Sequence, residues 1–132
     1  MPEGPEIRRA ADALSDAIAG LSIDHIRLPY HRLRPFGPRF RGQRIKAFRT
    51  HGKALLTDFD NGWTVYSHNQ LYGLWQVARP NDPLLPGRAL RLELGHQDRC
   101  IRLYSATDIS LWRTQNVAQH PFLSRLGPDI LD

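Results

Sequence analysis

The strongest constraint on the fold is a succession of short segments, all after Gly20, in which apolar and polar residues alternate. Alternation over four to eight residues is typical of strands that bury one face. The segments are Ile23–Leu28, Arg44–Arg49, Ala54–Phe59, Thr64–His68, Leu74–Ala78, Ala89–Leu94 and Cys100–Tyr104. Asp60-Asn61-Gly62 is a strong hairpin signal, and residues 95–98 predict another turn. Seven or eight short strands with frequent turns predict an antiparallel β-sandwich or barrel.

The segment before these strands has a different period. From Pro5 to Ala19, apolar residues recur at helical spacing, with Pro5 suited to the first helical position and Gly20 to the position after the last. The proline-containing stretches 29–42 and 79–87 predict loops, and residues 111–123 predict one or two short helices, the second starting at Pro121. The expected fold class is therefore α+β, mostly β, with an N-terminal helix packed on the sheets and short C-terminal helices.

Size and composition limit the functional classes. The chain has 132 residues, enough for one domain with its own core. No apolar run approaches the roughly 18 residues that a membrane span needs, and the N-terminus does not resemble a signal peptide. The single cysteine, Cys100, excludes an internal disulfide framework and a cysteine-rich zinc site in this chain, and its apolar neighbours suggest a buried strand thiol. We expect a cytoplasmic, monomeric protein without a membrane partner.

The net charge of +5 is unevenly distributed. Between His25 and Thr57 there are nine lysines and arginines and no acidic residue, with four aromatic residues interspersed. A block of one sign attracts polyanions, and phosphate contacts supply most nonspecific affinity for nucleic acids. A solvated basic face without a partner is the alternative. The block favours a nucleic-acid partner.

The first residues, Met1-Pro2-Glu3-Gly4-Pro5-Glu6, could carry chemistry. Removal of Met1 would make Pro2 a free secondary amine, and such amines titrate near neutral pH, at roughly 8. An amine attacks carbonyl-like carbons to form a Schiff base, which for proline is a permanently cationic iminium ion. If Met1 stays attached, the Pro2 nitrogen is an amide without nucleophilicity. Proline at position 2 also occurs in many proteins without any such role.

Three stretches together resemble a known family. They are the opening Pro2-Glu3-Gly4-Pro5-Glu6, the stretch His51-Gly52-Lys53-Ala54-Leu55-Leu56, and Ser67-His68-Asn69-Gln70-Leu71-Tyr72-Gly73. In this order they resemble the formamidopyrimidine-DNA glycosylase/endonuclease VIII family of base-excision repair enzymes, and the Gln-Leu-Tyr triplet resembles the endonuclease VIII branch. The resemblance continues through the stretch from His120 to Asp129.

The resemblance implies a role for each matching residue. Pro2 would be the nucleophile on C1′ of the damaged nucleotide, Glu3 the general acid at the sugar ring oxygen, and Lys53 an aid to β-elimination or a phosphate ligand. Glu6 would be a supporting carboxylate. The DNA-binding residues would be Gln70, Leu71 and Tyr72, which would enter the duplex beside the extruded nucleotide, and Arg125, which would contact phosphate. The implied activity is a bifunctional DNA glycosylase and lyase that removes oxidised pyrimidines from damaged double-stranded DNA.

Some residues keep simpler interpretations. Without the resemblance, Leu71 and Tyr72 could be strand core residues, but Asn69-Gln70 before them and Gly73 after them indicate an exposed loop tip. Lys53 could be a solvated lysine, although it is one of only two lysines beside 16 arginines. His51 and His68 lack a third ligand, so we expect hydrogen-bonded histidines at strand ends and no metal.

The resemblance also implies parts that this sequence lacks. Family members continue into a helix–two-turn–helix region and a C-terminal zinc finger, so we expect residues 1–132 to be the N-terminal catalytic domain and the one structural zinc to lie outside this chain, which itself needs no cofactor. Two alternatives stay open: a DNA-binding module without chemistry, and a structural or protein-interaction β-domain.

Overall fold

A computed structural model describes residues 3–120 of the chain, and their side chains from Glu6 onward. Within this part the chain forms two antiparallel four-stranded sheets. The first sheet has the strand order β1 (His25–Arg27), β6 (Leu90–His96), β7 (Arg99–Tyr104) and β5 (Leu74–Ala78). The second has the order β2 (Ile45–His51), β3 (Ala54–Phe59), β4 (Trp63–His68) and β8 (Asp108–Arg113). The expected fold class, a mostly β protein with an N-terminal helix, is confirmed.

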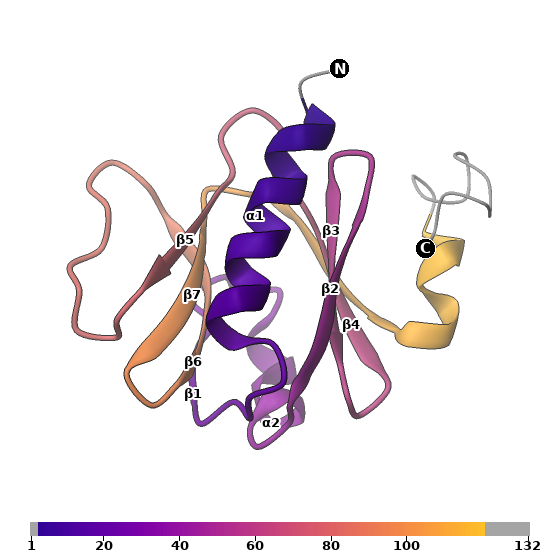
Figure 1. Ribbon diagram of the computed structural model, residues 1–132, viewed down its shortest axis with the longest axis horizontal. Coiled ribbons are helices and arrows are strands. Elements are labelled where there is room, and N and C mark those ends of the chain that lie inside the picture. The colour runs from indigo at the N-terminus through magenta and orange to yellow at the C-terminus, as the bar shows by residue number, and fades with distance from the viewer. Residues whose placement is uncertain (1–2, 121–132) are drawn as a thin grey trace.

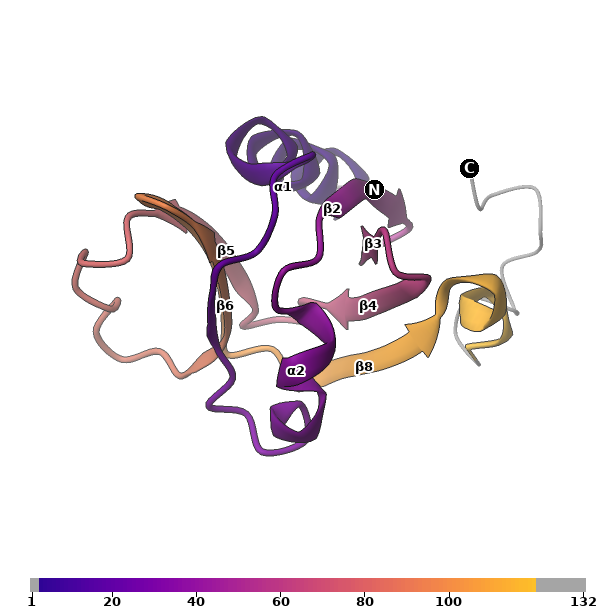
Figure 2. The ribbon, with the colours of Figure 1, turned by 90° about the horizontal axis from the view of Figure 1, so that it is seen from below.

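The N-terminal helix α1 (Glu3–Ile18) lies along one side of the two sheets, over the opening between them (Figures 1 and 2). It buries Leu14 and Ile18 almost completely, each 1% exposed. Gly20 ends the turn after the helix with φ +83°, a conformation that glycine adopts at little cost. The backbone N–H of Gly20 then donates to the carbonyl of Ile45, which ties the helix end to β2.

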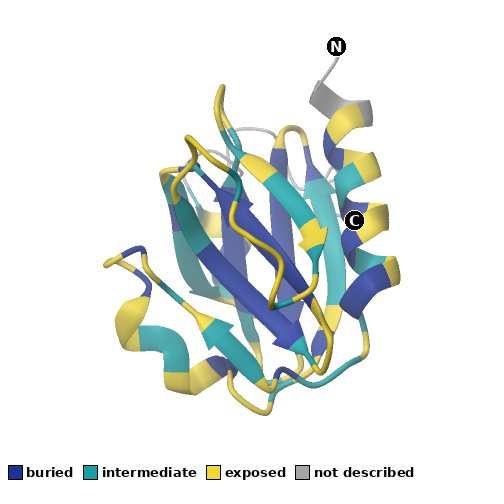
Figure 3. Cartoon of the chain, turned by 90° about the vertical axis from the view of Figure 1, so that its left-hand side faces the viewer, coloured by how far each residue is buried: buried dark blue, intermediate teal, exposed yellow. Residues whose placement is uncertain are grey.

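The main core lies between the two sheets and under α1. Figure 3 shows the buried central strands and the exposed loops around them. The side chains of the main core come from α1 and from both sheets: Ile7, Leu14, Ile18, Leu55, Phe59, Val65, Leu92, Leu94, Ile101, Leu103 and Ile109. A smaller cluster joins the second sheet to the 3₁₀ helix η2 (Thr114–Gln119): Ala54, Leu56, Tyr66, Val117 and the partly buried Trp112. Because successive side chains of a strand point to opposite faces of the sheet, β3 and β4 contribute to both clusters.

Two short connections carry the chain between the sheets. Residues 69–73, here named the crossing loop, lead from β4 in the second sheet to β5 in the first. Residues 105–107, the return segment, lead from β7 back to β8. The two connections are in contact, because the Thr107 hydroxyl donates to Gln70 Oε1 at 3.0 Å. This pairing places an exposed turn at one end of the sandwich.

A longer connection is held in place by a buried charged side chain. Residues 79–89, the proline loop, join β5 to β6. Arg102 on β7 and Glu93 on β6 are both fully buried, and Arg102 Nε donates to Glu93 Oε1 at 2.8 Å. The remaining donors of the Arg102 guanidinium reach the carbonyl oxygens of Arg79, Pro80, Asp82 and Pro83. One buried cation therefore satisfies four carbonyls of an irregular segment.

Glu93 has two further partners, His25 and Arg27 on β1, and Arg27 donates at 2.8 Å. Burial raises the pKa of Glu93, but the hydrogen bonds from Arg27, His25 and Arg102 outweigh it and hold that pKa below its ordinary value. The carboxylate is therefore charged at neutral pH, and β1, β6 and β7 are joined through it.

The structure corrects two secondary-structure predictions. Residues 29–42 are not only loop: a 3₁₀ helix η1 (Arg34–Phe36) and a short helix α2 (Gly37–Phe40) form there, each with proline in its first turn. Residues 108–113 form β8, which the sequence analysis did not predict, and only η2 lies where short C-terminal helices were expected. The helix expected at Pro121 lies outside the described residues. Cys100 is buried on β7, as expected.

Candidate functional site

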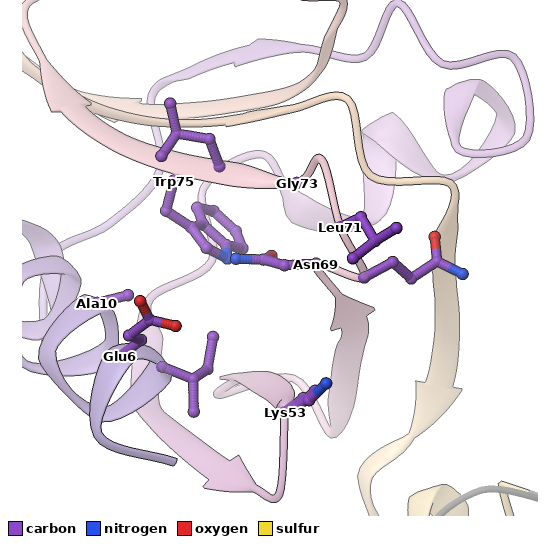
Figure 4. Close-up of a pocket in the computed structure, with 10 residues that line it drawn as sticks. Glu6, Ala10, Lys53, Asn69, Leu71, Gly73 and Trp75 are labelled. Atoms are coloured by element: carbon purple, nitrogen blue, oxygen red, sulfur yellow. The ribbon is translucent and has the colours of Figure 1, made fainter. Parts of the chain in front are cut away.

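A pocket of about 440 Å³ opens between α1, the β2–β3 turn and the crossing loop. Figure 4 shows its labelled residues, with Glu6, Lys53 and Leu71 on different sides of the opening. Its walls combine charged, amide and apolar side chains: Glu6, Ile7, Ala10, Lys53, Asn69, Gln70, Leu71, Gly73, Leu74 and Trp75. Four residues singled out from the sequence, Glu6, Lys53, Gln70 and Leu71, thus line one pocket, although they come from three separate segments.

Lys53 reaches the pocket because it occupies a two-residue turn. His51 pairs with Ala54 across β2 and β3, which leaves only Gly52 and Lys53 to reverse the chain. Gly52 has φ +61°, a value that glycine provides without strain in a tight hairpin. The lysine side chain is exposed on the turn, at the pocket rim. The short turn between two paired strands fixes the position of the Lys53 backbone.

Burial and the positive charge of Lys53 both lower the pKa of His68, which lies at the end of β4. Burial lowers the pKa of His68, Asp108 raises it, and Lys53 lowers it further. The backbone N–H of Gln70 donates to His68 Nδ1 at 3.1 Å. This nitrogen accepts a hydrogen bond and is therefore unprotonated, so a neutral His68 supports the crossing loop. The expectation of a hydrogen-bonded histidine is confirmed at this position.

The start of α1 forms another wall of the pocket. Glu6, Ile7 and Ala10 lie on its first turns and line the pocket. Glu3 is the first residue of the helix, but its side chain lies outside the described part, as do Pro2 and Arg125. The roles predicted for Pro2, Glu3 and Arg125 stay predictions. Pro2 directly precedes the helix in sequence, so the chain connects it to the segment that lines the pocket.

The crossing loop presents two large apolar side chains to solvent. Leu71 is 87% exposed and Tyr72 is 73% exposed. Gln70 adopts φ +55°, which reverses the chain just before them. Exposed apolar side chains at a loop tip indicate a contact surface, because nothing within the fold requires them there. The predicted exposed tip is therefore correct, and the interpretation of Leu71 and Tyr72 as strand core residues is wrong.

Gly73 closes the crossing loop tightly. Its N–H donates to the Asn69 carbonyl at 2.7 Å. A Cβ built on Gly73 would lie 2.6 Å from both Cα and O of Asn69, closer than real Cβ atoms approach backbone. Only glycine fits this turn without a backbone shift. The tip at Leu71 and Tyr72 is consequently held by a narrow base.

Two residues that the sequence analysis assigned no role fix the tip from outside. Thr107 of the return segment bonds the Gln70 side chain, and Tyr30 in turn donates to the Thr107 carbonyl at 3.0 Å. Arg88 of the proline loop donates from Nη1 to the Tyr72 carbonyl at 2.8 Å. No local sequence signal distinguishes a single arginine or threonine of this kind. Their contribution follows only from the sheet topology.

Two polar atoms in the pocket wall are buried without a hydrogen-bond partner among the described residues: Asn69 Oδ1 and Trp75 Nε1. A buried polar atom without a partner costs roughly 1–3 kcal/mol, so most buried polar atoms in folded proteins are hydrogen-bonded. Asn69 belongs to a quoted motif and could have been noted there, whereas Trp75 gave no signal beyond a strand residue.

His51 differs from the expectation. Its ring is 1% exposed, and neither ring nitrogen has a hydrogen-bond partner in the described part of the chain. The register explains this, because His51 faces Ala54, an apolar neighbour that offers no acceptor.

Within residues 3–120, no three His, Cys, Asp or Glu side chains gather as metal ligands. None of the helices in this part of the chain has the length and apolar character that a membrane span requires.

Part of the basic block from His25 to Thr57 is neutralised within the fold. Arg49 pairs with Asp58 at 2.6 Å, and Arg27 pairs with Glu93, so acids from elsewhere neutralise part of the block. The aromatic residues Tyr30 and Phe40 are buried in the core. The polyanion surface predicted from the block is therefore smaller than the sequence implies.

Comparison with known proteins identifies the family of this chain. A sequence model of the formamidopyrimidine-DNA glycosylase N-terminal domain matches residues 1–108. The chain belongs to this family. The endonuclease 8 proteins of Klebsiella pneumoniae subsp. pneumoniae and of Salmonella paratyphi B are each 48% identical to it over all 132 residues. The chain covers 50% of either relative, and thus spans about half the length of the curated relatives it matches.

Solved structures of the family share the fold. Two crystal structures of the Lactococcus lactis formamidopyrimidine-DNA glycosylase match with a TM-score of 0.79 at 21% identity, one bound non-covalently to DNA that contains an AP site and one with DNA that contains FAPY-dG. The match covers 92% of this chain and 48% of each of those chains. The two-sheet architecture with its N-terminal helix is thus the fold of the family's N-terminal domain.

Proposed function

We propose that the complete protein containing this chain is a bifunctional DNA glycosylase and AP lyase that removes oxidised pyrimidines from duplex DNA, and that residues 1–132 form its N-terminal catalytic domain. The observation that carries the proposal is the pocket itself. It gathers Lys53, Glu6 and the exposed crossing loop around the first turns of the helix that directly follows Pro2. The family membership and the 48% identity to endonuclease 8 proteins support the same activity.

The chemistry would proceed through Pro2 once Met1 is removed. The Pro2 amine attacks C1′ of the damaged nucleotide, the base leaves with the bonding electron pair, and the proton lost from the Pro2 nitrogen neutralises the departing base. Glu3 gives a proton to the ring oxygen, the C1′–O bond breaks, and a cationic iminium remains. The cation acidifies the proton on C2′, whose loss expels the 3′ phosphate and cuts the strand. Lys53, at the pocket rim, would assist this elimination or hold a phosphate, and Glu6 would support the charge balance.

The crossing loop would act as a wedge. Extruding a nucleotide costs a few kcal/mol of unstacking, and apolar or planar side chains that enter the gap offset this cost. Leu71 and Tyr72 are exposed at the tip, and Gln70 stands beside them with its side chain held by Thr107. The loop borders the pocket, so a wedge and a binding place for the extruded nucleotide would adjoin each other.

A second candidate is a DNA-binding module without chemistry in this 132-residue form. Because the chain covers only 50% of the length of each relative, this second candidate is favoured for the 132-residue form. The family resemblance implies further DNA contacts and a structural zinc, and both would be supplied outside this chain. None of the proposed chemical steps involves that zinc. This candidate predicts salt-sensitive DNA affinity and no strand cleavage by residues 1–132 alone.

Borohydride reduction tests the proposal, because it traps an iminium as a stable amine. The complete protein with Met1 removed is incubated with a duplex that carries an abasic site or an oxidised pyrimidine. We expect a covalent complex that Pro2→Gly abolishes or strongly reduces and that requires Glu3. Absence of any complex, or equal trapping by Pro2→Gly without dependence on Glu3, would contradict the assigned roles. The isolated chain serves as the comparison, and robust cleavage by it would exclude the binding-module candidate.

A further inference from the structure

A second cavity of about 440 Å³ also borders the crossing loop, through Tyr72. We name it the arginine notch; its lining residues are Tyr72, Pro86, Gly87, Arg88, Arg91 and Ser105. It shares no lining residue with the pocket of Glu6 and Lys53. The crossing loop, the proline loop, β6 and the return segment all contribute to it, so it depends on the same sheet crossing that builds the tip.

The notch contains two cations and no carboxylate among its lining residues. Elsewhere in the described part, Arg27 and Arg102 pair with Glu93, and Arg49 pairs with Asp58. By contrast, neither Arg88 nor Arg91 forms an ion pair within residues 3–120. Two neighbouring positive charges without a counter-charge repel each other, so an anion bound between them would be favoured.

The arginine geometry leaves donors available. Arg88 is exposed and uses Nη1 for the Tyr72 carbonyl. The Arg91 guanidinium lies over the Tyr30 ring, 4.8 Å from its centroid, and its buried Nε has no hydrogen-bond partner among the described residues. Each guanidinium carries five N–H donors in a planar fork. Such a fork matches the spacing of phosphate oxygens better than an ammonium does.

We propose that Arg88 and Arg91 bind a backbone phosphate of the duplex that the crossing loop enters. The inference rests on the proposed function, which supplies the duplex. Tyr72 lines the notch and also forms the exposed tip, so a phosphate beside the tip is the nearest anion that an engaged duplex offers. The same guanidinium that holds the Tyr72 carbonyl would contact the phosphate, which couples the seating of the tip to the grip on the backbone.

The test compares charge-removing variants of the complete protein. Arg88→Gln removes one notch cation, and Arg99→Gln is the matched control: Arg99 is also an exposed arginine and lies at the other end of β7, about 20 Å along the strand direction from Ser105. Affinity for a duplex with an uncleavable tetrahydrofuran abasic analogue is measured between about 50 and 200 mM salt. We expect Arg88→Gln to reduce the slope of log K against log salt by about 0.9, and Arg99→Gln to leave it unchanged.

Two further measurements separate a phosphate contact from a structural role. Arg88→Lys keeps the charge and should restore the salt slope. A duplex series in which single phosphates are replaced by neutral methylphosphonates should reveal one position where the wild type loses affinity and Arg88→Gln loses nothing more. An unchanged slope together with weaker binding by Arg88→Gln would mean that Arg88 acts only through the Tyr72 carbonyl, and would overturn the proposal. Equal losses by both proteins at every phosphate would overturn it as well.

Borohydride trapping on the same proteins keeps the two hypotheses apart. If the wild type traps an abasic duplex and the slope of Arg88→Gln is unchanged, the notch proposal fails while the proposed activity stands. If the slope falls as expected but nothing is trapped, the phosphate contact stands and the proposed activity fails.

Discussion

The two loops that flank β5 are both irregular, yet they are held in opposite ways. The proline loop is held by Arg102, which is fully buried and donates hydrogen bonds to four carbonyls of the loop. The crossing loop is held by contacts near the surface, from His68, Thr107 and Arg88, and its tip residues are exposed. The difference shows two ways to hold an irregular segment. A buried charge stabilises the proline loop, whereas surface contacts position the crossing loop and leave its tip exposed.

This comparison predicts that the proline-loop anchor matters for stability and the crossing-loop tip matters for DNA binding. The largest effect is expected for Arg102→Ala, which leaves Glu93 buried with fewer partners and four carbonyls without their donor. Removing one partner of a buried ion pair costs about 3–5 kcal/mol of unfolding free energy. Urea unfolding of the chain measures it, with the exposed Arg99→Ala on the same strand expected within about 0.5 kcal/mol of wild type. A loss below about 1 kcal/mol for Arg102→Ala would break the comparison.

The next effect separates two exposed leucines. Leu71 is at the crossing-loop tip, and Leu84, 43% exposed, is on the proline loop. We expect both alanine variants to unfold within about 0.5 kcal/mol of wild type. In the complete protein, Leu71→Ala should bind the abasic-analogue duplex about tenfold more weakly, a loss of about 1.4 kcal/mol, whereas Leu84→Ala should bind normally. Equal affinities for the two variants would show that the tip does not enter the duplex.

A smaller effect is expected from reshaping the crossing loop without touching its tip residues. Gly73→Ala forces Asn69 to move, because the new Cβ would lie 2.6 Å from its backbone. The affinity for the abasic-analogue duplex should fall by a few-fold, and the amide resonances of the crossing loop should shift. Gly37→Ala is the control, since its Cβ would meet only Leu28 Cδ1 at an ordinary 3.6 Å. Wild-type binding and unshifted resonances in Gly73→Ala would contradict a rigid loop base.

The smallest effect sharpens the proline-loop side of the comparison through pH. The pKa of Glu93 lies below its ordinary value in the folded chain, so the folded state binds fewer protons there than the unfolded state. Its contribution to stability is present above the unfolded pKa, about 4.3, and is lost as pH falls through the folded pKa. Urea unfolding at several pH values should show stability declining below about pH 4, with a shallower decline in Glu93→Gln. Equal slopes for both proteins would contradict the buried charge.

Much of the fold could be predicted because most strands are short apolar segments bounded by turn residues, although β3, β4, β6 and β7 are buried on both faces. Ala54–Phe59 and Leu74–Ala78 coincide with β3 and β5. β8 was missed because residues 111–123 were interpreted as short helices; in the structure Ile109 faces the main core and Trp112 packs on the smaller cluster, so both faces of this strand carry apolar residues. The prolines in residues 29–42 were interpreted as loop signals, although Pro35 and Pro38 start short helices.

The candidate site was predictable where a residue's neighbours reveal its conformation. Asn69-Gln70 before Leu71 and Gly73 after Tyr72 indicated a loop tip, and this tip is present. The turn at Gly52 and Lys53 was not predicted from the sequence. The partners of the crossing loop could not be predicted, because Thr107 and Arg88 come from segments far along the chain that the sheet topology brings to it. Long-range charge pairing was hidden for the same reason: Arg27 lies 66 residues from Glu93 in sequence.

The central claim is that the amine of Pro2, and not the ammonium of Lys53, bonds to the sugar at this pocket. Mass spectrometry of peptides from the borohydride-trapped complex tests it most directly, because the adduct mass and its fragments identify the modified residue. The proposed function predicts an N-terminal peptide that begins at Pro2, lacks Met1 and carries the reduced sugar on its nitrogen. An adduct on Lys53, with the N-terminal peptide unmodified or still carrying Met1, would contradict it.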